Sequence, residues 1–170
     1  MTESAERALK NAYALLKNTT PLENVNCGCL CSSACCGGNE NDCVFLFPYE
    51  DEFVKDNGFT ICETEGNSGF SALRCNGECN RNFRPLGCRI FPLFPLILPE
   101  NGHEKIVVIT DPRASICPLT LENARVSPKF VRAVRRAGIY LMRDPENNGY
   151  MKRMTNELLE IIELRNKLEK

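Results

Sequence analysis

Histidine and tryptophan are almost missing from this chain of 170 residues, which contains one histidine, His103, and no tryptophan. A metal site in this chain must therefore use thiolates, with carboxylate or water at most, in place of several imidazoles. Long apolar runs are missing too, since the longest, Ile90–Leu98, has nine residues and two of them are proline. A helix that crosses a membrane needs about 20 apolar residues.

Neither sign of charge dominates, because 22 acidic residues face 21 basic ones and leave a formal charge of −1. This balance gives no reason to expect a polyanion as partner. The first 17 residues carry several charges where a signal peptide would have an apolar run. We therefore expect a cytoplasmic protein with no membrane segment.

Cysteine is the residue in excess: there are eleven, and ten of them lie between Cys27 and Cys88. In the reducing cytoplasm a cysteine cluster is more often metal-binding or redox-active than a disulfide framework. Residues 22–43 are rich in Cys, Gly, Ser and Asn and cannot bury an apolar face. A bound metal is the economical way to order them, since structural zinc sites supply about 10–16 kcal/mol.

The cysteine spacings narrow the kind of site. Three pairs have C-x3-C spacing, and Cys35–Cys36 is an adjacent pair that cannot easily close a relaxed disulfide. The C-x2-C pair common in zinc fingers and the bacterial ferredoxin run are both absent from the sequence. Soft thiolates select zinc, iron–sulfur clusters or Cu(I). Arg84 and Arg89 bracket Cys88, and we expect them to offset thiolate charge by donating to the sulfurs.

Periodicity predicts helices at both ends of the chain. An apolar stripe predicts a helix over about residues 3–17, capped by Thr2 or Ser4. Ser127–Pro128 predicts a helix start, and a further helix follows Pro145. We expect this last helix to pack on the first one or on a partner chain.

Short strands are predicted between these helices, at Val44–Phe47, Phe59–Cys62 and Gly69–Leu73. Asn101–Gly102 predicts a hairpin of Leu93–Leu98 with Lys105–Thr110. The expected fold class is α+β: a small, irregular, Cys-rich β core centred on metal, with an N-terminal helix and two C-terminal helices. Residues 1–120 would form the metal-binding domain, and residues 121–170 a helical extension packed on it.

The segment from Cys27 to about residue 95 resembles the YkgJ-type zinc- or iron-chelating domain family. In that family an early cysteine cluster ending in a CC pair is joined to a later cysteine and an RPxxCRxFP box. This chain has the CC pair at Cys35–Cys36 and a full box at Arg84–Pro92. Its early cluster departs from the family, with C-x3-C-x3-CC from Cys27 in place of C-x2-C-x2-CC.

The resemblance implies that Cys35, Cys36, Cys79 and Cys88 are ligands, with one or more of Cys27 and Cys31. We add two further cysteines of the same region, one of which leads a C-x3-C pair. The eight candidate metal ligands are Cys27, Cys31, Cys35, Cys36, Cys43, Cys75, Cys79 and Cys88. The spacing leaves zinc and an iron–sulfur cluster equally open.

The preferred function is therefore metal binding by a thiolate cluster, with a structural, electron-transfer or sensing role. One alternative is a thiol- or cluster-dependent redox or methyl-transfer accessory enzyme, for which no catalytic residue is assigned. Another is a helical interaction protein with purely structural cysteines, in which the C-terminal helices dock a protein partner or a second copy of the chain. Nucleic acid is not an expected partner, because no reading motif accompanies the basic residues of Lys129–Arg143.

Overall fold

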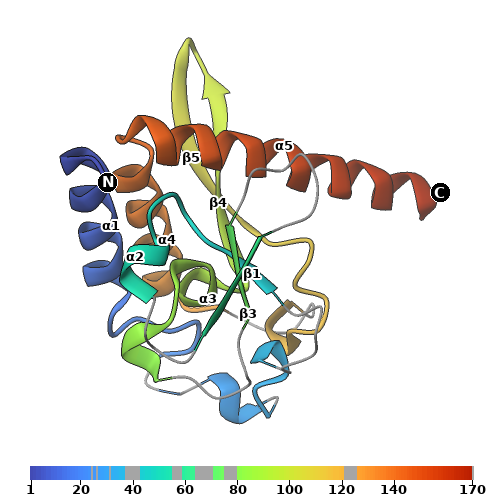
Figure 1. Cartoon of the computed structure of the whole chain (residues 1–170). Coiled ribbons are helices and arrows are strands. Elements are labelled where there is room, and N and C mark those ends of the chain that lie inside the picture. Colours follow the sequence, from blue (N-terminus) through green and yellow to red (C-terminus); the bar gives the residue numbers. More distant parts are fainter. Residues whose placement is uncertain are drawn as a thin grey trace.

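The computed structural model describes residues 1–23, 25, 27–30, 32–36, 43–54, 59–63, 71–74, 80–120 and 126–169. Three candidate ligands, Cys31, Cys75 and Cys79, lie outside the described residues, and the side chain of Cys36 is not described either. Within the described part the fold is α+β, as predicted, with five α-helices and two antiparallel sheets. Figure 1 shows the course of the chain.

The α-helices are α1 (Glu3–Leu16), α2 (Asp51–Val54), α3 (Leu86–Ile90), α4 (Pro128–Leu141) and α5 (Pro145–Leu168). The strands are β1 (Cys43–Phe45), β2 (Thr60–Glu63), β3 (Ser71–Arg74), β4 (Leu93–Glu100) and β5 (His103–Thr110). Short 3₁₀ helices are η1 (Cys27–Leu30), η2 (Ala34–Cys36), η3 (Arg81–Phe83) and η4 (Pro118–Thr120). The predicted strands and long helices are thus present, with ends shifted by a few residues.

Helix α1 forms where its apolar stripe predicts it. Ala5, Leu9, Ala12 and Leu16 are all buried, and they face α4, which runs alongside α1 in Figure 1. Thr2 is the N-cap, since its Oγ1 accepts from the backbone N of Ala5 at 3.2 Å. The second predicted cap, Ser4, instead donates to Asp144 Oδ2 at 2.6 Å.

Strands β4 and β5 form the predicted hairpin, in register from Leu93↔Thr110 to Glu100↔His103. Asn101 and Gly102 both have positive φ, which is the backbone that a two-residue turn of the I′ type requires. Helix α4 packs closely on this hairpin at Gly138, where an added Cβ would lie 2.8 Å from Cβ of Pro95. His103 is exposed at the tip of the hairpin.

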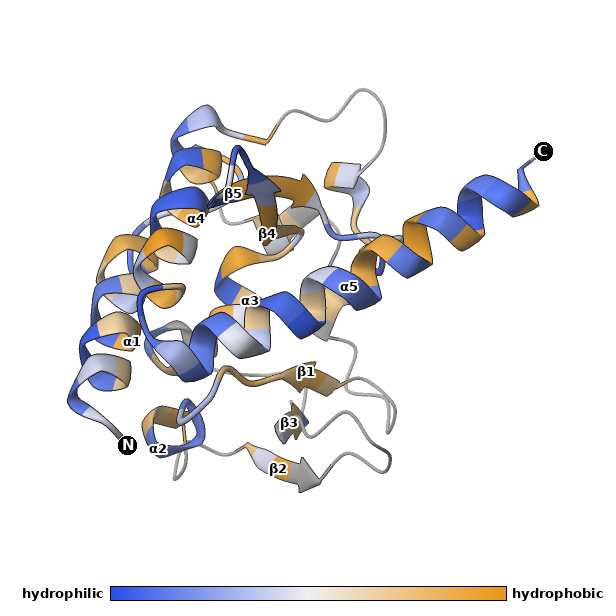
Figure 2. Ribbon diagram, turned by 90° about the horizontal axis from the view of Figure 1, so that it is seen from above, coloured by the Kyte–Doolittle hydropathy of each residue, from blue (hydrophilic) through white to orange (hydrophobic). Residues whose placement is uncertain are grey.

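The first half of α5 packs mainly on β4, whereas the sequence led us to expect packing on the first helix or on a partner chain. Met151, Met154 and Leu158 are fully buried there, and Thr155 Oγ1 accepts from the backbone N of Ile97 at 3.0 Å. The second half extends past the rest of the molecule and leaves Leu168 exposed (Figures 1 and 2). None of the described helices is long and apolar enough to cross a membrane.

One main core lies between α1, α4, α5 and the hairpin, and it takes residues from both sides of position 120. We call these four elements the helix–hairpin region. The second sheet has the strand order β1-β3-β2 and covers a separate small cluster of Leu46, Val54 and Leu73. We call the described residues of 27–88, which include this sheet, the cysteine region.

Candidate metal centre

Five of the candidate ligands lie on four different elements of the cysteine region. Cys27 lies on η1, Cys35 and Cys36 lie on η2, Cys43 begins β1 and Cys88 lies in the middle of α3. Cys35 and Cys43 are exposed, and Cys27 and Cys88 are partly buried. No disulfide joins any two of the six cysteines whose side chains are described.

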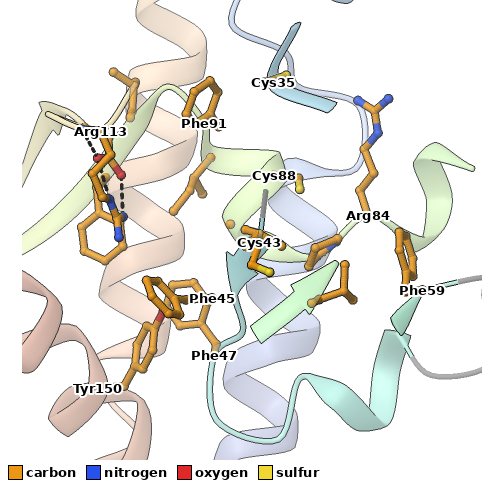
Figure 3. A pocket seen from close by; sticks show the side chains of 18 of the residues that line it. Cys35, Cys43, Phe45, Phe47, Phe59, Arg84, Cys88, Phe91, Arg113 and Tyr150 are labelled. Atoms are coloured by element: carbon orange, nitrogen blue, oxygen red, sulfur yellow. Dashed lines mark hydrogen bonds and ion pairs between the residues drawn. The ribbon is translucent and has the colours of Figure 1, made fainter. Parts of the chain in front are cut away.

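Three of the predicted ligands line one cavity. Cys35 and Cys43 come from the early cysteine stretch and Cys88 comes from the RPxxCRxFP box, and all three face a cavity of about 290 Å³ together with Arg84. Figure 3 shows the three thiols and Arg84 on one side of this cavity, with Arg113 and Tyr150 on the other. We call it the thiol cavity. Cysteines more than 40 residues apart in the sequence thus line the same cavity.

The described thiols line one cavity, but they do not form a complete set of metal ligands. Within the described ranges, no three Cys, His, Asp or Glu side chains are close enough together to hold a metal ion. Any additional ligand would have to come from candidates that lie outside those ranges, such as Cys31, Cys75 and Cys79. The set of eight metal ligands therefore remains a prediction made from the sequence.

Cys88 reaches the cavity because α3 lies very close to β1. Gly87 permits this approach, since a Cβ there would come within 2.5 Å of Val44 Cγ2 and 3.3 Å of the Phe45 carbonyl oxygen. The residue before Cys88 in the box is thus the contact point between the helix and the strand that Cys43 begins. A larger side chain at position 87 would push Cys88 away from Cys43.

A buried carboxylate, Glu50, fixes the start of α3. Its Oε1 accepts from Tyr13 Oη at 2.6 Å and from the backbone N of Leu86, and its Oε2 accepts from the backbone N of Phe47 at 2.9 Å. Burial raises the pKa of Glu50, while these hydrogen bonds and nearby Arg89 act in the opposite direction. Glu50 therefore ties α1, the end of β1 and the helix that carries Cys88 into one network.

Nothing in the sequence pointed to Glu50. It lies in an acidic stretch, residues 40–65, for which a solvated surface is the simplest interpretation, yet its side chain is fully buried. No local pattern distinguishes it from neighbouring acids such as Asp51 and Glu52.

The two arginines of the box lie in different surroundings. Arg84 lines the thiol cavity on the same side as the three thiols. Arg89 donates from Nε to the Arg84 carbonyl oxygen at 2.7 Å and from Nη2 to the Asn82 carbonyl oxygen at 2.8 Å. Its guanidinium also lies 4.8 Å from the centre of the Tyr13 ring. These contacts hold the turn before α3, so they position Cys88 through the backbone.

A third arginine, Arg74, was missed from the sequence. It ends β3 and pairs with Cys43 of β1, and it directly precedes Cys75 in the chain. Its Nε is buried and, among the described residues, has no hydrogen-bond partner. A buried donor of this kind calls for an acceptor. A metal-bound thiolate beside Cys43 would supply one, so the donor chemistry of the site fits a thiolate-held metal. The adjacent Cys75 was the available signal.

No protein-family model, curated protein or solved structure matches this chain. The likeness to the YkgJ-type domain therefore stays a prediction from the sequence, and the function has to be argued from the geometry of the thiol cavity and its surroundings.

Proposed function

We propose that this protein binds metal through thiolates of the cysteine region, as zinc or as an iron–sulfur centre, at the thiol side of the cavity. The observation that carries this proposal is that Cys35, Cys43 and Cys88, from distant parts of the sequence, line the same cavity. Further thiolates would come from the candidates on the same two stretches, Cys31, Cys36, Cys75 and Cys79.

The charges around the cavity support thiolates in preference to neutral thiols. Four thiolates on a divalent ion leave a net charge of −2, and cations that donate to sulfur stabilise such a site. Arg84 lines the cavity, and Arg74 brings a buried donor to the strand position opposite Cys43. These two cations match the excess negative charge of the proposed centre.

Because the cysteine region has only a small core of its own, a bound metal would stabilise its structure. The cluster of Leu46, Val54 and Leu73 is separate from the main core, and none of the side chains described in η1 and η2 belongs to either core cluster. An ion that joins η2, β1 and α3 would hold these elements at a single point. An iron–sulfur centre would add electron transfer or sensing to this role.

The proposal is tested by anaerobic purification followed by elemental analysis, sulfide assay and a visible spectrum. Brown protein with iron and labile sulfide would identify a cluster, and colourless protein with stoichiometric zinc would identify a structural site. Protein that carries neither metal, or in which the candidate thiols pair as disulfides, would overturn the proposal.

The variant Cys88→Ser tests the site itself, with Cys117→Ser as its matched control. Both thiols are partly buried, but Cys117 does not line the thiol cavity. Cys88→Ser should lower the metal content by at least about half, since a lost ligand weakens metal binding strongly. Cys117→Ser should leave it unchanged. Equal metal content in the two variants would remove Cys88 from the coordination sphere.

A further inference from the structure

The thiol cavity extends beyond the thiols into a chamber with aromatic walls. Five of the nine phenylalanines of the chain line it: Phe45, Phe47, Phe59, Phe91 and Phe94. An apolar shell around a metal site controls solvent access and redox potential, but the ligands themselves leave the space between these rings unfilled. The apolar part of the cavity therefore calls for an explanation of its own.

The floor of this chamber is fixed by the main core. Phe47 and Tyr150 are each 2% exposed, and their ring centres lie 4.8 Å apart. The mouth is lined by partly exposed residues, with Ile116 at 59% exposure. A fixed apolar floor with an open mouth is the form that small-molecule sites take.

On the side opposite the thiols lies Arg113, some of whose N–H donors are not used by its ion pair with Asp111. The nearly buried carboxylate of Asp111 accepts from Arg113 Nε at 3.0 Å and from Arg113 Nη2 at 2.7 Å. A guanidinium has five N–H donors, and within the described part of the chain the other three have no partner. Asp111 thus holds Arg113 in place, with its guanidinium 5.8 Å from the centre of the Phe45 ring. The Arg113 donors that remain can reach an oxygen inside the cavity.

We propose that the thiol cavity binds a small aromatic carboxylate, with its ring between the phenylalanines and its carboxylate on Arg113. Aromatic walls favour a ring by offset or edge-to-face contact. A fixed guanidinium with unused donors favours a carboxylate over a neutral acceptor. On the side away from the thiols, the charged lining residues are Arg113 and Asp111, and they form an ion pair with each other.

The volume limits the size of the ligand. A cavity of about 290 Å³ lies near the lower end of the range for small-molecule sites. It suits a one- or two-ring acid of about a dozen non-hydrogen atoms and is too small for a folded peptide. The end of such a ligand that points away from Arg113 would face Cys43 and Cys88. That it meets a metal there rests on the proposed function, whereas its binding to Arg113 and the aromatic walls does not.

Indole-3-carboxylate and 3-methylindole are suitable probes, because they share a ring and differ in the carboxylate. The chain has no tryptophan, so indole fluorescence reports on the probe alone. Titration of the full-length protein should show about tenfold tighter binding of indole-3-carboxylate than of 3-methylindole. Arg113→Lys should abolish this preference, because lysine bound to Asp111 has no second fork of donors. A loss of folding would weaken both probes together and leave their ratio unchanged.

A second pair of variants locates the binding site. Ile116→Asp places a negative charge at the mouth, and Leu164→Asp places the same charge on α5 at a position with the same exposure of 59%. The first should weaken indole-3-carboxylate about tenfold or more, and the second should not. Failure of indole-3-carboxylate to bind, a preference that survives Arg113→Lys, or equal effects of the two Asp variants would overturn the inference. Metal content measured on the same samples separates the two proposals: metal without probe binding rejects only this inference, and probe binding without metal rejects only the proposed function.

Discussion

The main core takes fully buried side chains from α1, β4, α4 and α5, whereas the separate cluster under β1 and β3 has three buried residues, Leu46, Val54 and Leu73. Burial of a large aliphatic or aromatic side chain contributes about 1.5–3 kcal/mol. The helix–hairpin region can therefore fold on its apolar contacts. The cysteine region has only this small cluster of its own, although Phe47 and Leu86 anchor one part of it to the main core. A metal would therefore matter most to the stability of the parts of the cysteine region that lie away from this anchor.

Metal removal should produce the largest difference between the two regions. A metal site of the proposed kind contributes about 10–16 kcal/mol, all of it to the elements that the ligands join. Treatment with a chelator and a reductant should raise amide exchange in β1 and β3 by about two orders of magnitude or more. Exchange in β4 and α4 should hardly change, and added metal should restore the slow rates. Equal acceleration in β1 and β4 would show that the two regions do not differ in this way.

Truncation of a buried side chain in the main core should lower stability without changing metal content, the opposite of what metal removal does. Phe130 of α4 is fully buried, and Phe130→Ala should lower the free energy of unfolding by about 3–5 kcal/mol. Urea unfolding followed by circular dichroism measures this loss, and the metal content of the folded protein should not change. The matched control is Phe83→Ala in the cysteine region, where Phe83 is 42% exposed and its loss should cost less than about 0.5 kcal/mol. A larger loss in the control would contradict the assignment of the core.

The two regions also differ in how much of their structure the sequence could predict. The helix–hairpin region follows from local patterns: the stripe from Ala5 to Leu16, the Ser127–Pro128 cap and the Asn101–Gly102 turn each specify a local backbone. The strands around β3 were predicted nearly in place for the same reason.

The surroundings of the candidate site could not be predicted in this way, because they depend on contacts between distant segments. Glu50 is buried only because α1, β1 and α3 meet around it. Arg74 becomes opposite to Cys43 only through the register of β1 and β3. The aromatic chamber combines residues from β1, α3, β4 and α5, and no stretch of sequence contains it.

Arg74→Met sharpens the comparison within the cysteine region. The variant keeps an unbranched side chain of similar length but loses the buried Nε donor beside Cys43. Loss of a hydrogen bond to a ligand costs about 10–100-fold in metal affinity, and we expect a change in this range in a competition with a colorimetric chelator. Arg132→Met on the exposed face of α4 is the matched control and should bind metal as tightly as the wild type. Unchanged affinity in Arg74→Met would mean that its guanidinium does not contact the centre.

Glu50, in the cysteine region, and Asp144, in the helix–hairpin region, should make stability depend on pH in opposite ways. Burial raises the pKa of Glu50, so the folded protein holds this proton to higher pH than the unfolded chain does. Stability from this group is then greatest below its unfolded pKa of about 4.5 and falls as the pH rises through the folded value. The slope reaches at most about 1.4 kcal/mol per pH unit. Glu50→Gln should remove this fall, as measured by urea unfolding between pH 4.5 and 8.

Asp144 should respond in the opposite sense and more weakly. Burial alone would raise the pKa of this N-cap of α5, but hydrogen bonds from Ser4 and Asn147 lower it overall. Its stabilising effect is present above the unfolded pKa of about 3.9 and is lost as the pH falls through the folded value. Asp144→Ala should cost about 1 kcal/mol at neutral pH and less in acid. Acid also protonates thiolates and releases metal, but it does so in both proteins. The difference between the wild-type and variant curves therefore isolates the carboxylate, and a difference that grows in acid would contradict the assignment.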